Sequence, residues 1–369
     1  MPKVSVVMSS YNHARFIGQA ITSVLNQSYT DLELVIVENG STDNSITVIK
    51  SFSDPRIKLH ELTTNRGGSE GMNTAIEYST GEYIALLNSD DYFLPDKLSK
   101  QIAELESKPH LGAVFGLCRV VDERGAPHPD TFRQTLFKTR WPDHLSYLKY
   151  FLFHGNCVCH PTAVIRRSAY DQTGTFDTRL RRLLDFDYWI RLFSRYETQV
   201  IDEELAAHRF LDDESNESGM RPEVWAASRW EYFHILYHYL YLDTDLFSRI
   251  FTSEIASLEL DGLDRLVQLG RIAVSAQHIS AQAFGLELLY DAVTLKLPGI
   301  TAKEVQELSG SLDIYGVTKY YYLETTNVAL ANELATSRAS LHAVYNSKSW
   351  KLTQWMRDVM TLIRSYVYQ

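Results

Sequence analysis

Two adjacent aspartates stand directly after an apolar run in the first half of the chain. The run from Tyr83 to Leu87 leads into Asn88-Ser89-Asp90-Asp91. Buried charges need partners, whereas a Mg²⁺ or Mn²⁺ ion that also contacts phosphate groups takes one or two carboxylate oxygens. A cation site is therefore the chemical interpretation of the pair, and it needs the support of the surrounding motifs. Its structural alternative is a helix cap or a turn, where Asp-Asp is also common.

Two further polar segments follow apolar, β-branched runs. They are residues 9–13 (SSYNH) and residues 38–43 (ENGSTD). In an open parallel sheet, ligands bind beyond the carboxyl ends of the strands, where the amino ends of helices offer N–H groups. We therefore expect these two segments and the acidic loop to converge at one edge of a sheet.

A second acidic segment, residues 185–187 (DFD), begins a helical pattern. Asp185 and Asp187 fall in its first turn, where capping by Asp185 is the structural alternative to a chemical role and is also favoured by the helix dipole. From these residues alone, capping is the preferred interpretation. The apolar positions at helical spacing are expected to pack inward, namely Phe186, Trp189, Ile190 and Phe193.

These segments need a scaffold, and the first 215 residues supply an α/β pattern. Short β-branched or aromatic runs alternate with helical patterns, which predicts a Rossmann-like, mainly parallel sheet flanked by helices. The first predicted helix has one apolar stripe that includes Phe16, Ile21 and Leu25. The predicted strands span residues 4–9, 32–38, 56–62, 83–88 and 113–122.

The remaining chain predicts a helical region and a tail. At 369 residues the chain exceeds one compact domain, and the β-rich runs stop near residue 215. We predict a catalytic domain over 1–218, a helical domain over 219–315 and a tail over 316–369. A weak heptad over 320–345 favours a homodimer. An amphipathic helix over 352–367 favours peripheral contact with the inner membrane. The alternative for this helix is docking onto the protein itself.

Composition narrows the class of protein. With 45% apolar and 22% charged residues, the chain is typical of globular proteins, and a net charge of -10 argues against a nucleic-acid partner. Three cysteines are too few for a disulfide framework, and the chain begins as a strand without a secretory signal. No apolar run reaches the roughly 18 residues that span a bilayer. We expect a cytoplasmic protein, or one bound peripherally to the cytoplasmic face of the membrane.

Four ordered motifs closely resemble the family 2 glycosyltransferases with the GT-A fold. The motifs are residues 4–12 (VSVVMSSYN), 23–29 (SVLNQSY), 33–43 (ELVIVENGSTD) and 81–91 (GEYIALLNSDD), and the resemblance covers roughly residues 3–215. It implies that Tyr11 stacks on a nucleobase, that Ser9 helps to hold this base, that Asp90 contacts the ribose, and that Asp91 binds Mg²⁺ or Mn²⁺.

The remaining donor contacts depart in part from the family pattern. The family has two aspartates where this chain has Glu38 and Asn39. The Asn39 amide can still accept from and donate to the edge of uracil, which keeps a UDP-sugar as the expected donor. Arg66 lies in a glycine-rich segment that resembles the flexible donor loop of the family, so it is expected to contact the nucleotide or its phosphates.

The resemblance also implies that Asp185 is the catalytic base. The reaction would be one inverting displacement, in which Asp185 takes the proton of an acceptor hydroxyl in a glycan or a lipid-linked glycan of a bacterial surface polysaccharide. An ordinary aspartate pKa of about 3.9 is expected. Leu184 replaces a glutamate of the pattern, and Leu211 replaces a histidine near the metal, which removes the expected third ligand.

Other readings remain open or are set aside. A non-catalytic sugar-nucleotide-binding or scaffold protein of the same fold is the alternative that Asn39, Leu184 and Leu211 motivate. A dinucleotide-dependent oxidoreductase is disfavoured because no glycine-rich fingerprint follows the first strand. Residues 157–160 (CVCH) lack a second Cys or His pair at metal-ligand spacing, so we predict a buried strand there. His234 and His238 share a helical face, but the tyrosines near them favour an aromatic packing surface over a metal site.

Overall fold

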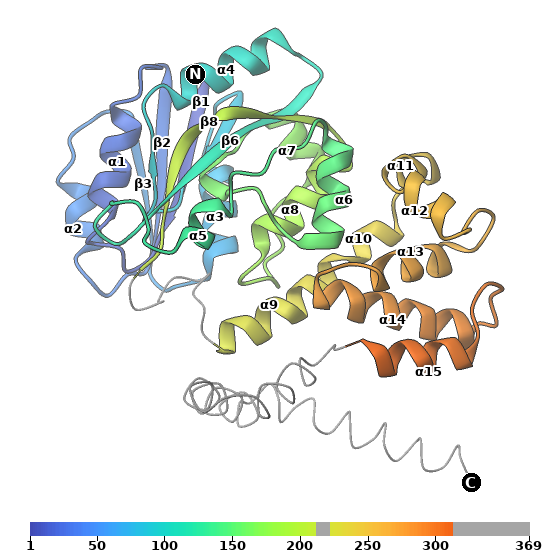
Figure 1. Cartoon of the computed structure of the whole chain (residues 1–369). Helices are drawn as coiled ribbons and strands as arrows, with labels where there is room; N and C mark the ends of the chain where they lie inside the picture. The colour runs from blue at the N-terminus through green and yellow to red at the C-terminus, as the bar shows by residue number, and fades with distance from the viewer. Residues whose placement is uncertain (212–221, 313–369) are drawn as a thin grey trace.

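The computed structural model describes residues 1–211 and 222–312, and Figure 1 shows a sheet flanked by helices with a helical region beside it. The described strands form one eight-stranded sheet in the order β3-β2-β1-β4-β7-β6-β8-β5. Their bounds are β1 Val4–Ser10, β2 Leu32–Asn39, β3 Ile57–Leu62, β4 Tyr83–Leu86, β5 Tyr92–Phe93, β6 Leu111–Val121, β7 Val164–Arg166 and β8 Glu197–Arg209.

The predicted α/β fold is confirmed, and the sheet proves to be mixed. Strands β3, β2, β1 and β4 are parallel neighbours, and β6 is parallel to β8. The short strand β7 lies antiparallel between β4 and β6, and β5 pairs antiparallel with β8. The predicted exits after β1, β2 and β4 therefore open at the same edge of the sheet. Strand β8 is parallel to β6 and runs in the same direction as these strands.

Alternation along the strands divides the core into two layers, because successive side chains point to opposite faces of a sheet. Val4, Val6 and Met8 face one layer, and Val7 faces the other. Helices α1 (Ile17–Leu25) and α4 (Lys97–Ser107) pack in the first layer. Helices α3 (Gly68–Glu77) and α8 (Leu184–Phe193) pack in the second. The remaining helices before the first gap are α2 Ser45–Lys50, α5 Thr131–Thr135, α6 His144–His154, the 3₁₀ helix η1 His160–Thr162 and α7 Arg167–Thr173.

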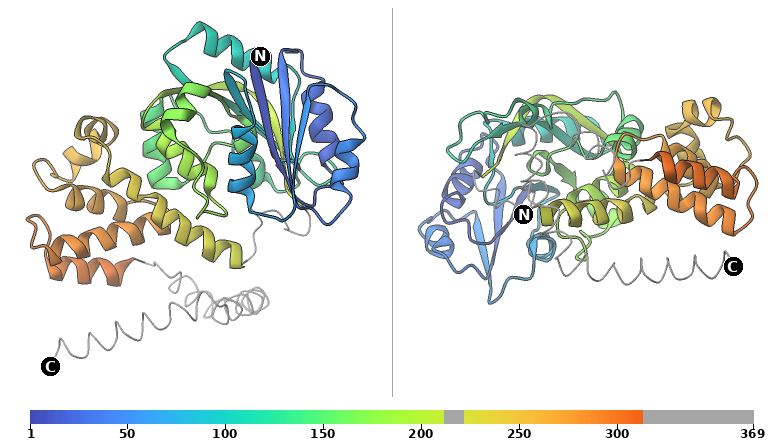
Figure 2. Two further views of the ribbon diagram at one scale, coloured as in Figure 1. Left: turned by 180° about the vertical axis from the view of Figure 1, so that it is seen from behind. Right: turned by 60° about the horizontal axis from the view of Figure 1, so that its bottom comes forward.

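Residues 222–312 are helical, as predicted, and they share the core of the sheet domain. The second core layer runs without a break from Phe151 in α6 and Phe186 in α8 to Tyr232 and Phe284. Figure 2 shows the helical region lying against one side of the sheet domain. Its helices are α9 Pro222–Ile235, α10 Tyr237–Leu240, α11 Thr244–Ile250, α12 Thr252–Ser257, α13 Arg265–Val274, α14 Ile279–Thr294 and α15 Ala302–Ser311.

The predicted boundaries of the tail lie outside the described residues. The boundary near 218 falls in 212–221, and the heptad over 320–345 and the terminal amphipathic helix over 352–367 fall in 313–369. The three-part domain division, the homodimer, the membrane contact and the cytoplasmic location therefore stay predictions. Within residues 1–211 and 222–312, no helix combines the length and the apolar character that crossing a membrane requires.

Candidate functional site

Asp91 is the most firmly held residue of the acidic loop. It is 1% exposed, and its Oδ1 accepts a hydrogen bond from the Arg209 backbone N–H at 2.9 Å. Its Oδ2 accepts from the Asn88 amide at 2.9 Å. The Nδ1 atom of His208, at the end of β8, lies 3.1 Å from Oδ1 and 3.2 Å from Oδ2. The carboxylate is thus fixed in orientation beyond the end of β4.

His208 and Asp91 form a buried charge pair. Burial disfavours both charged forms, but their mutual attraction and hydrogen bonding outweigh it, lowering the pKa of Asp91 and raising the pKa of His208 to about 9. His208 was not among the site residues predicted from the sequence. The family pattern directed attention to Leu211, two residues after Arg209, whereas the histidine of this chain stands one residue before Arg209.

Asp90 is buried, and its backbone carbonyl is bound by a neighbouring side chain. Its carbonyl oxygen accepts from Nε of Arg209 at 2.9 Å, and the buried guanidinium also donates to the carbonyl of Glu123 at 2.7 Å and to Gln19 at 2.7 Å. Burial, followed by the charge of Asp91, raises the pKa of Asp90. The two acids therefore have opposite tendencies, with Asp91 kept ionised and Asp90 more readily protonated.

The three polar strand exits converge, as predicted. The side-chain oxygen of Asn12 accepts from the Thr42 backbone N–H at 2.8 Å, and the Asn12 N–H donates to Ser41 at 2.9 Å. Nδ1 of His13 lies 2.7 Å from the hydroxyl of Ser89. The exits of β1, β2 and β4 are thus joined by side-chain hydrogen bonds, and Asn12 adopts the left-handed conformation that asparagine tolerates at this turn.

Tyr11 and Ser9, both predicted to hold a base, lie at the carboxyl end of β1, and Ser9 lies against helix α3. The Tyr11 side chain is 39% exposed and has room to meet a planar ligand. A Cβ atom on Gly71 would lie 2.1 Å from Oγ of Ser9 and 3.1 Å from the amide nitrogen of Asn39. Only a glycine lets helix α3 approach β1 and β2 this closely.

Asn39 and Glu38 both brace the loops around them. The Asn39 side chain accepts from the Arg66 backbone N–H at 3.0 Å and donates to the Gly67 carbonyl at 3.0 Å. The Glu38 carboxylate accepts from the N–H groups of Gly40 at 3.2 Å and Ser41 at 2.9 Å. Asn39 thus ties β2 to the segment that carries the exposed Arg66. The predicted ligand contacts of Glu38, Asn39 and Arg66 stay predictions.

Asp185 lies in the first turn of α8. Its Oδ1 accepts from the N–H of Phe186 at 2.8 Å, and its Oδ2 accepts from the amide of Asn156 at 3.4 Å. The expectation of an ordinary pKa is wrong, because burial raises the pKa of Asp185 to about 6. The N-cap residue is Leu183, which has no side-chain cap, whereas Asp185 itself accepts a first-turn N–H, so its catalytic role and the capping alternative both stay predictions. Phe186, Trp189, Ile190 and Phe193 are fully buried, as predicted.

The helical region supplies the cap that α8 lacks in its own sequence. The carboxylate of Glu231 in α9 is 4% exposed and accepts from the N–H groups of Arg181 at 2.9 Å, Arg182 at 2.8 Å and Leu183 at 2.8 Å. A glutamate at this place compensates the start of α8 electrostatically, because a helix amino end carries partial positive charge. Glu231 was not among the residues predicted from the sequence.

The histidine and cysteines of the 157–160 segment are buried in the core, as predicted, although these residues do not form a strand. Burial raises the pKa of the Cys157 thiol to about 12 and lowers the pKa of His160 to about 4. Both groups are therefore neutral at pH 7. Nε2 of His160 has no hydrogen-bond partner among the described residues.

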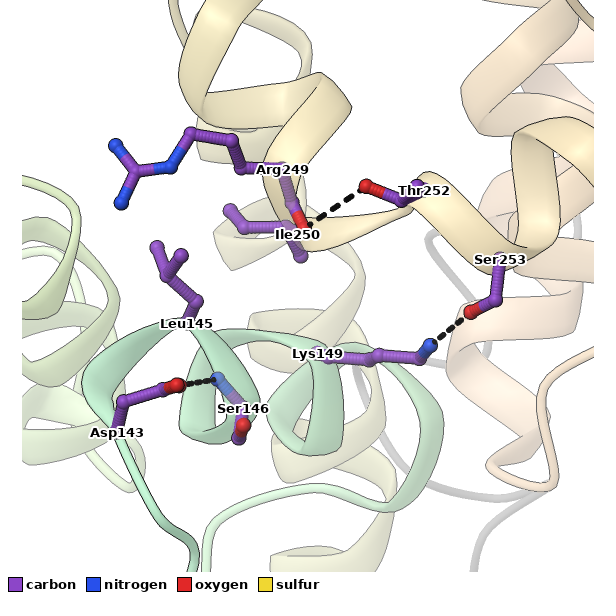
Figure 3. A pocket seen from close by; sticks show the side chains of 8 residues that line it. All are labelled: Asp143, Leu145, Ser146, Lys149, Arg249, Ile250, Thr252 and Ser253. Carbon is purple, nitrogen blue, oxygen red and sulfur yellow. Dashed lines mark hydrogen bonds between the residues drawn. The ribbon is translucent and has the colours of Figure 1, made fainter.

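Two hollows lie away from this site. One, of about 370 Å³, lies between α6 and the junction of α11 with α12, where Lys149 donates to Ser253 at 2.7 Å and Asp143 caps α6 through the N–H of Ser146 at 2.8 Å (Figure 3). The hydrogen-bonding groups named here are therefore paired within the walls of the hollow. The other hollow, of about 900 Å³, lies between the sheet domain and α9 and α10. Neither includes Asp90, Asp91 or Asp185.

The family model for Glycosyl transferase family 2 matches residues 5–174. The Bacillus subtilis (strain 168) protein named "Putative glycosyltransferase EpsE" is 34% identical over 197 residues, which are 52% of this chain and 67% of that protein. An Escherichia coli protein, the UDP-Glc:alpha-D-GlcNAc-diphosphoundecaprenol beta-1,3-glucosyltransferase WfgD, is 34% identical over 139 residues, or 36% of this chain and 54% of that protein.

The fold is shared with a solved structure. The crystal structure of S. aureus TarS 1–349 in complex with UDP superposes with a TM-score of 0.55 at 18% identity, covering 88% of this chain and 93% of that one. The sheet, the converging strand exits and the sequence matches agree, and the chain belongs to glycosyl transferase family 2, with the GT-A fold.

Proposed function

We propose that the chain transfers a sugar from a UDP-sugar to a hydroxyl of a glycan or lipid-linked glycan, with inversion, in the synthesis of a surface polysaccharide. The observation that carries this proposal is the ionised Asp91, held by His208 at the edge where three polar strand exits meet. The name of WfgD supports both the donor and the class of acceptor, because that relative is a UDP-Glc-dependent glucosyltransferase acting on a diphosphoundecaprenol-linked sugar.

The donor site suits a divalent cation shared with a diphosphate. Within the described residues, no group of three His, Cys, Asp or Glu side chains is arranged to hold a metal ion. A cation that takes one carboxylate and completes its shell from phosphate and water needs no such group. Asp91 would hold it, and His208 stands next to the same oxygens. A bound Mg²⁺ or Mn²⁺ would neutralise charge developing on the departing diphosphate.

Asp185 is suited to take the proton of the acceptor hydroxyl. Its pKa of about 6 leaves the carboxylate ionised at pH 7 to 8 and makes it a stronger base than an ordinary aspartate. The hydrogen bonds from Phe186 and Asn156 fix the direction of its two oxygens. No covalent intermediate is needed, because the acceptor oxygen attacks the anomeric carbon opposite the leaving diphosphate.

The proposal is tested with Asp91→Ala. The wild-type protein is screened by thermal shift against nucleotide sugars with Mn²⁺ or Mg²⁺, and donor hydrolysis and UDP binding are then titrated with Mn²⁺. We expect Asp91→Ala to lose the metal dependence and to weaken UDP binding together, while Asp171→Ala, at an exposed position, behaves as wild type. Metal-dependent UDP binding that persists in Asp91→Ala contradicts the assignment of the metal. A wild-type protein that neither hydrolyses nor transfers any donor supports the non-catalytic alternative.

A further inference from the structure

The hollow of about 900 Å³ between the sheet domain and the helical region has no part in the donor site. Its walls come from the segment between α7 and α8, from α8 itself, and from α9 and α10. Its volume is within the range of ligand pockets, about 300–1,000 Å³. We propose that this cavity binds a neutral oligosaccharide, the part of the acceptor glycan remote from the reacting hydroxyl. The inference rests on the proposed function.

Exposed aromatic rings on one wall are the first observation. Trp230 and Tyr241 line the cavity and are 57% and 79% exposed. The His234 ring stands edge-on to Trp230, with ring centroids 4.3 Å apart. Both rings border the same cavity and offer it a rigid apolar face with a polar edge. Sugar rings present C–H faces that match such surfaces.

Paired charges on the opposite wall are the second observation. Asp187 accepts from Nη2 of Arg191 at 2.7 Å and lies 2.7 Å from Nε2 of His238. Asp177 accepts from Nη2 of Arg179 at 2.6 Å. Each arginine of the cavity is thus neutralised by a carboxylate. A phosphate or an acidic glycan would have to compete with these carboxylates, whereas neutral hydroxyl groups can use the donors and acceptors that remain.

Helix α8 contributes one carboxylate to the cavity and another to the proposed reaction centre. Asp187 lines the cavity, and Asp185 stands two residues before it on α8. Two residues correspond to about 200° of helix rotation, so the two carboxylates point to opposite sides of a helix about 10 Å across. A glycan held in the cavity with its reacting hydroxyl at Asp185 would therefore have to extend past this helix. This geometry fits a chain of several sugars and not a single sugar.

Binding is measured by calorimetry and by saturation-transfer NMR with β-linked tetrasaccharides of glucose and of N-acetylglucosamine, and donor hydrolysis is measured separately. Trp230→Ala and Tyr241→Ala should each weaken tetrasaccharide binding by about tenfold, which is about 1.4 kcal/mol. Trp230→Phe keeps an aromatic face and should stay within roughly threefold of wild type. The matched controls Trp141→Ala and Tyr290→Ala remove exposed rings outside the cavity and should change nothing.

The outcomes separate this inference from the proposed function. Donor hydrolysis should be unchanged in all five variants, which also shows that they fold. Unchanged tetrasaccharide affinity in Trp230→Ala and Tyr241→Ala overturns the inference, and so does a wild-type protein that hydrolyses the donor yet binds neither tetrasaccharide. Tighter binding of an acidic galacturonate tetrasaccharide also overturns it. Ring-dependent tetrasaccharide binding without any donor hydrolysis would uphold the cavity and remove the proposed function.

Discussion

The Glu231 carboxylate accepts a hydrogen bond from the Leu183 backbone N–H at 2.8 Å, just before helix α8 begins. Helix α9 in this way completes the amino end of the helix that carries Asp185, although 48 residues separate the two partners. The family pattern has a glutamate at position 184, where this chain has leucine. The contact from Glu231 places a different carboxylate against the same end of the helix.

Glu231→Ala is expected to lower stability and turnover together. Removing the carboxylate strips the acceptor from three backbone N–H groups, which costs about 2–3 kcal/mol in the free energy of unfolding. Turnover should fall while the KM for the donor stays unchanged, because the effect reaches Asp185 and not the donor loop. Glu231→Gln, which keeps one side-chain oxygen, should recover much of both, and Glu287→Ala, at an exposed position on α14, is the control. A donor KM that rises as turnover falls would place the role of Glu231 elsewhere.

Asp185→Asn is expected to lower turnover by roughly 10²–10⁴ without loss of donor affinity. The wild-type kcat/KM should decline below pH 6, about tenfold per pH unit, because the raised pKa of about 6 protonates the base there. The residual activity of the variant should lack this acid limb. Steady-state kinetics from pH 5 to 8 measure both effects, and near-normal turnover in Asp185→Asn would remove this residue from the role of base.

The same substitution should stabilise the protein. The folded pKa of Asp185, about 6, exceeds the ordinary value of 3.8, so the folded state binds the proton more tightly and wild-type stability falls as pH rises from about 4 to 6. Asp185→Asn should therefore gain up to about 3 kcal/mol in the free energy of unfolding at pH 8, and nothing at pH 3.5. Urea unfolding at the two pH values measures the difference. An equal gain at both pH values would contradict the raised pKa.

His208→Gln should remove a stabilisation that depends on pH. The folded pKa of His208, about 9, lies above its ordinary value of 6.5, so its contribution is complete below pH 6.5 and is lost as pH rises through 9. In EDTA, wild type should lose about 1–3 kcal/mol between pH 6.5 and 9.5 relative to His208→Gln. Parallel stability curves for the two proteins would show that the pair with Asp91 carries no charge.

Gly71→Ala should damage the base-binding side of the donor site. The new Cβ would fall 2.1 Å from Oγ of Ser9, which forces β1 and α3 apart at a cost of about 1–3 kcal/mol. UDP affinity should fall by roughly tenfold for a loss of about 1.4 kcal/mol in binding. Gly310→Ala, in helix α15 and with nothing within 4 Å, is the matched control. Equal UDP affinity in the two variants would mean that Ser9 does not border the nucleotide.

Local patterns predicted much of this site, and the missing parts depend on distant contacts. The exits of β1, β2 and β4 could be located because each follows an apolar strand in the sequence. His208 reaches Asp91 across 117 residues, and the antiparallel pairing of β5 with β8, which sets Tyr92 opposite Ala207, brings them together. The antiparallel strand β7 has three residues, too few for a periodic signal. The raised pKa of Asp185 depends on burial, which no single motif encodes.

The contacts of helix α8 determine where this chain could be recombined with a related protein. Glu231 and His238 come from the helical region, yet both bind the amino-terminal half of α8 or the residues just before it. A chimera joined near residue 219 would combine a foreign helical region with a native α8 and break both contacts. A junction upstream of Asp177 transfers the helix with its partners, so recombination intended to change the acceptor should begin there and not at the predicted boundary near residue 218.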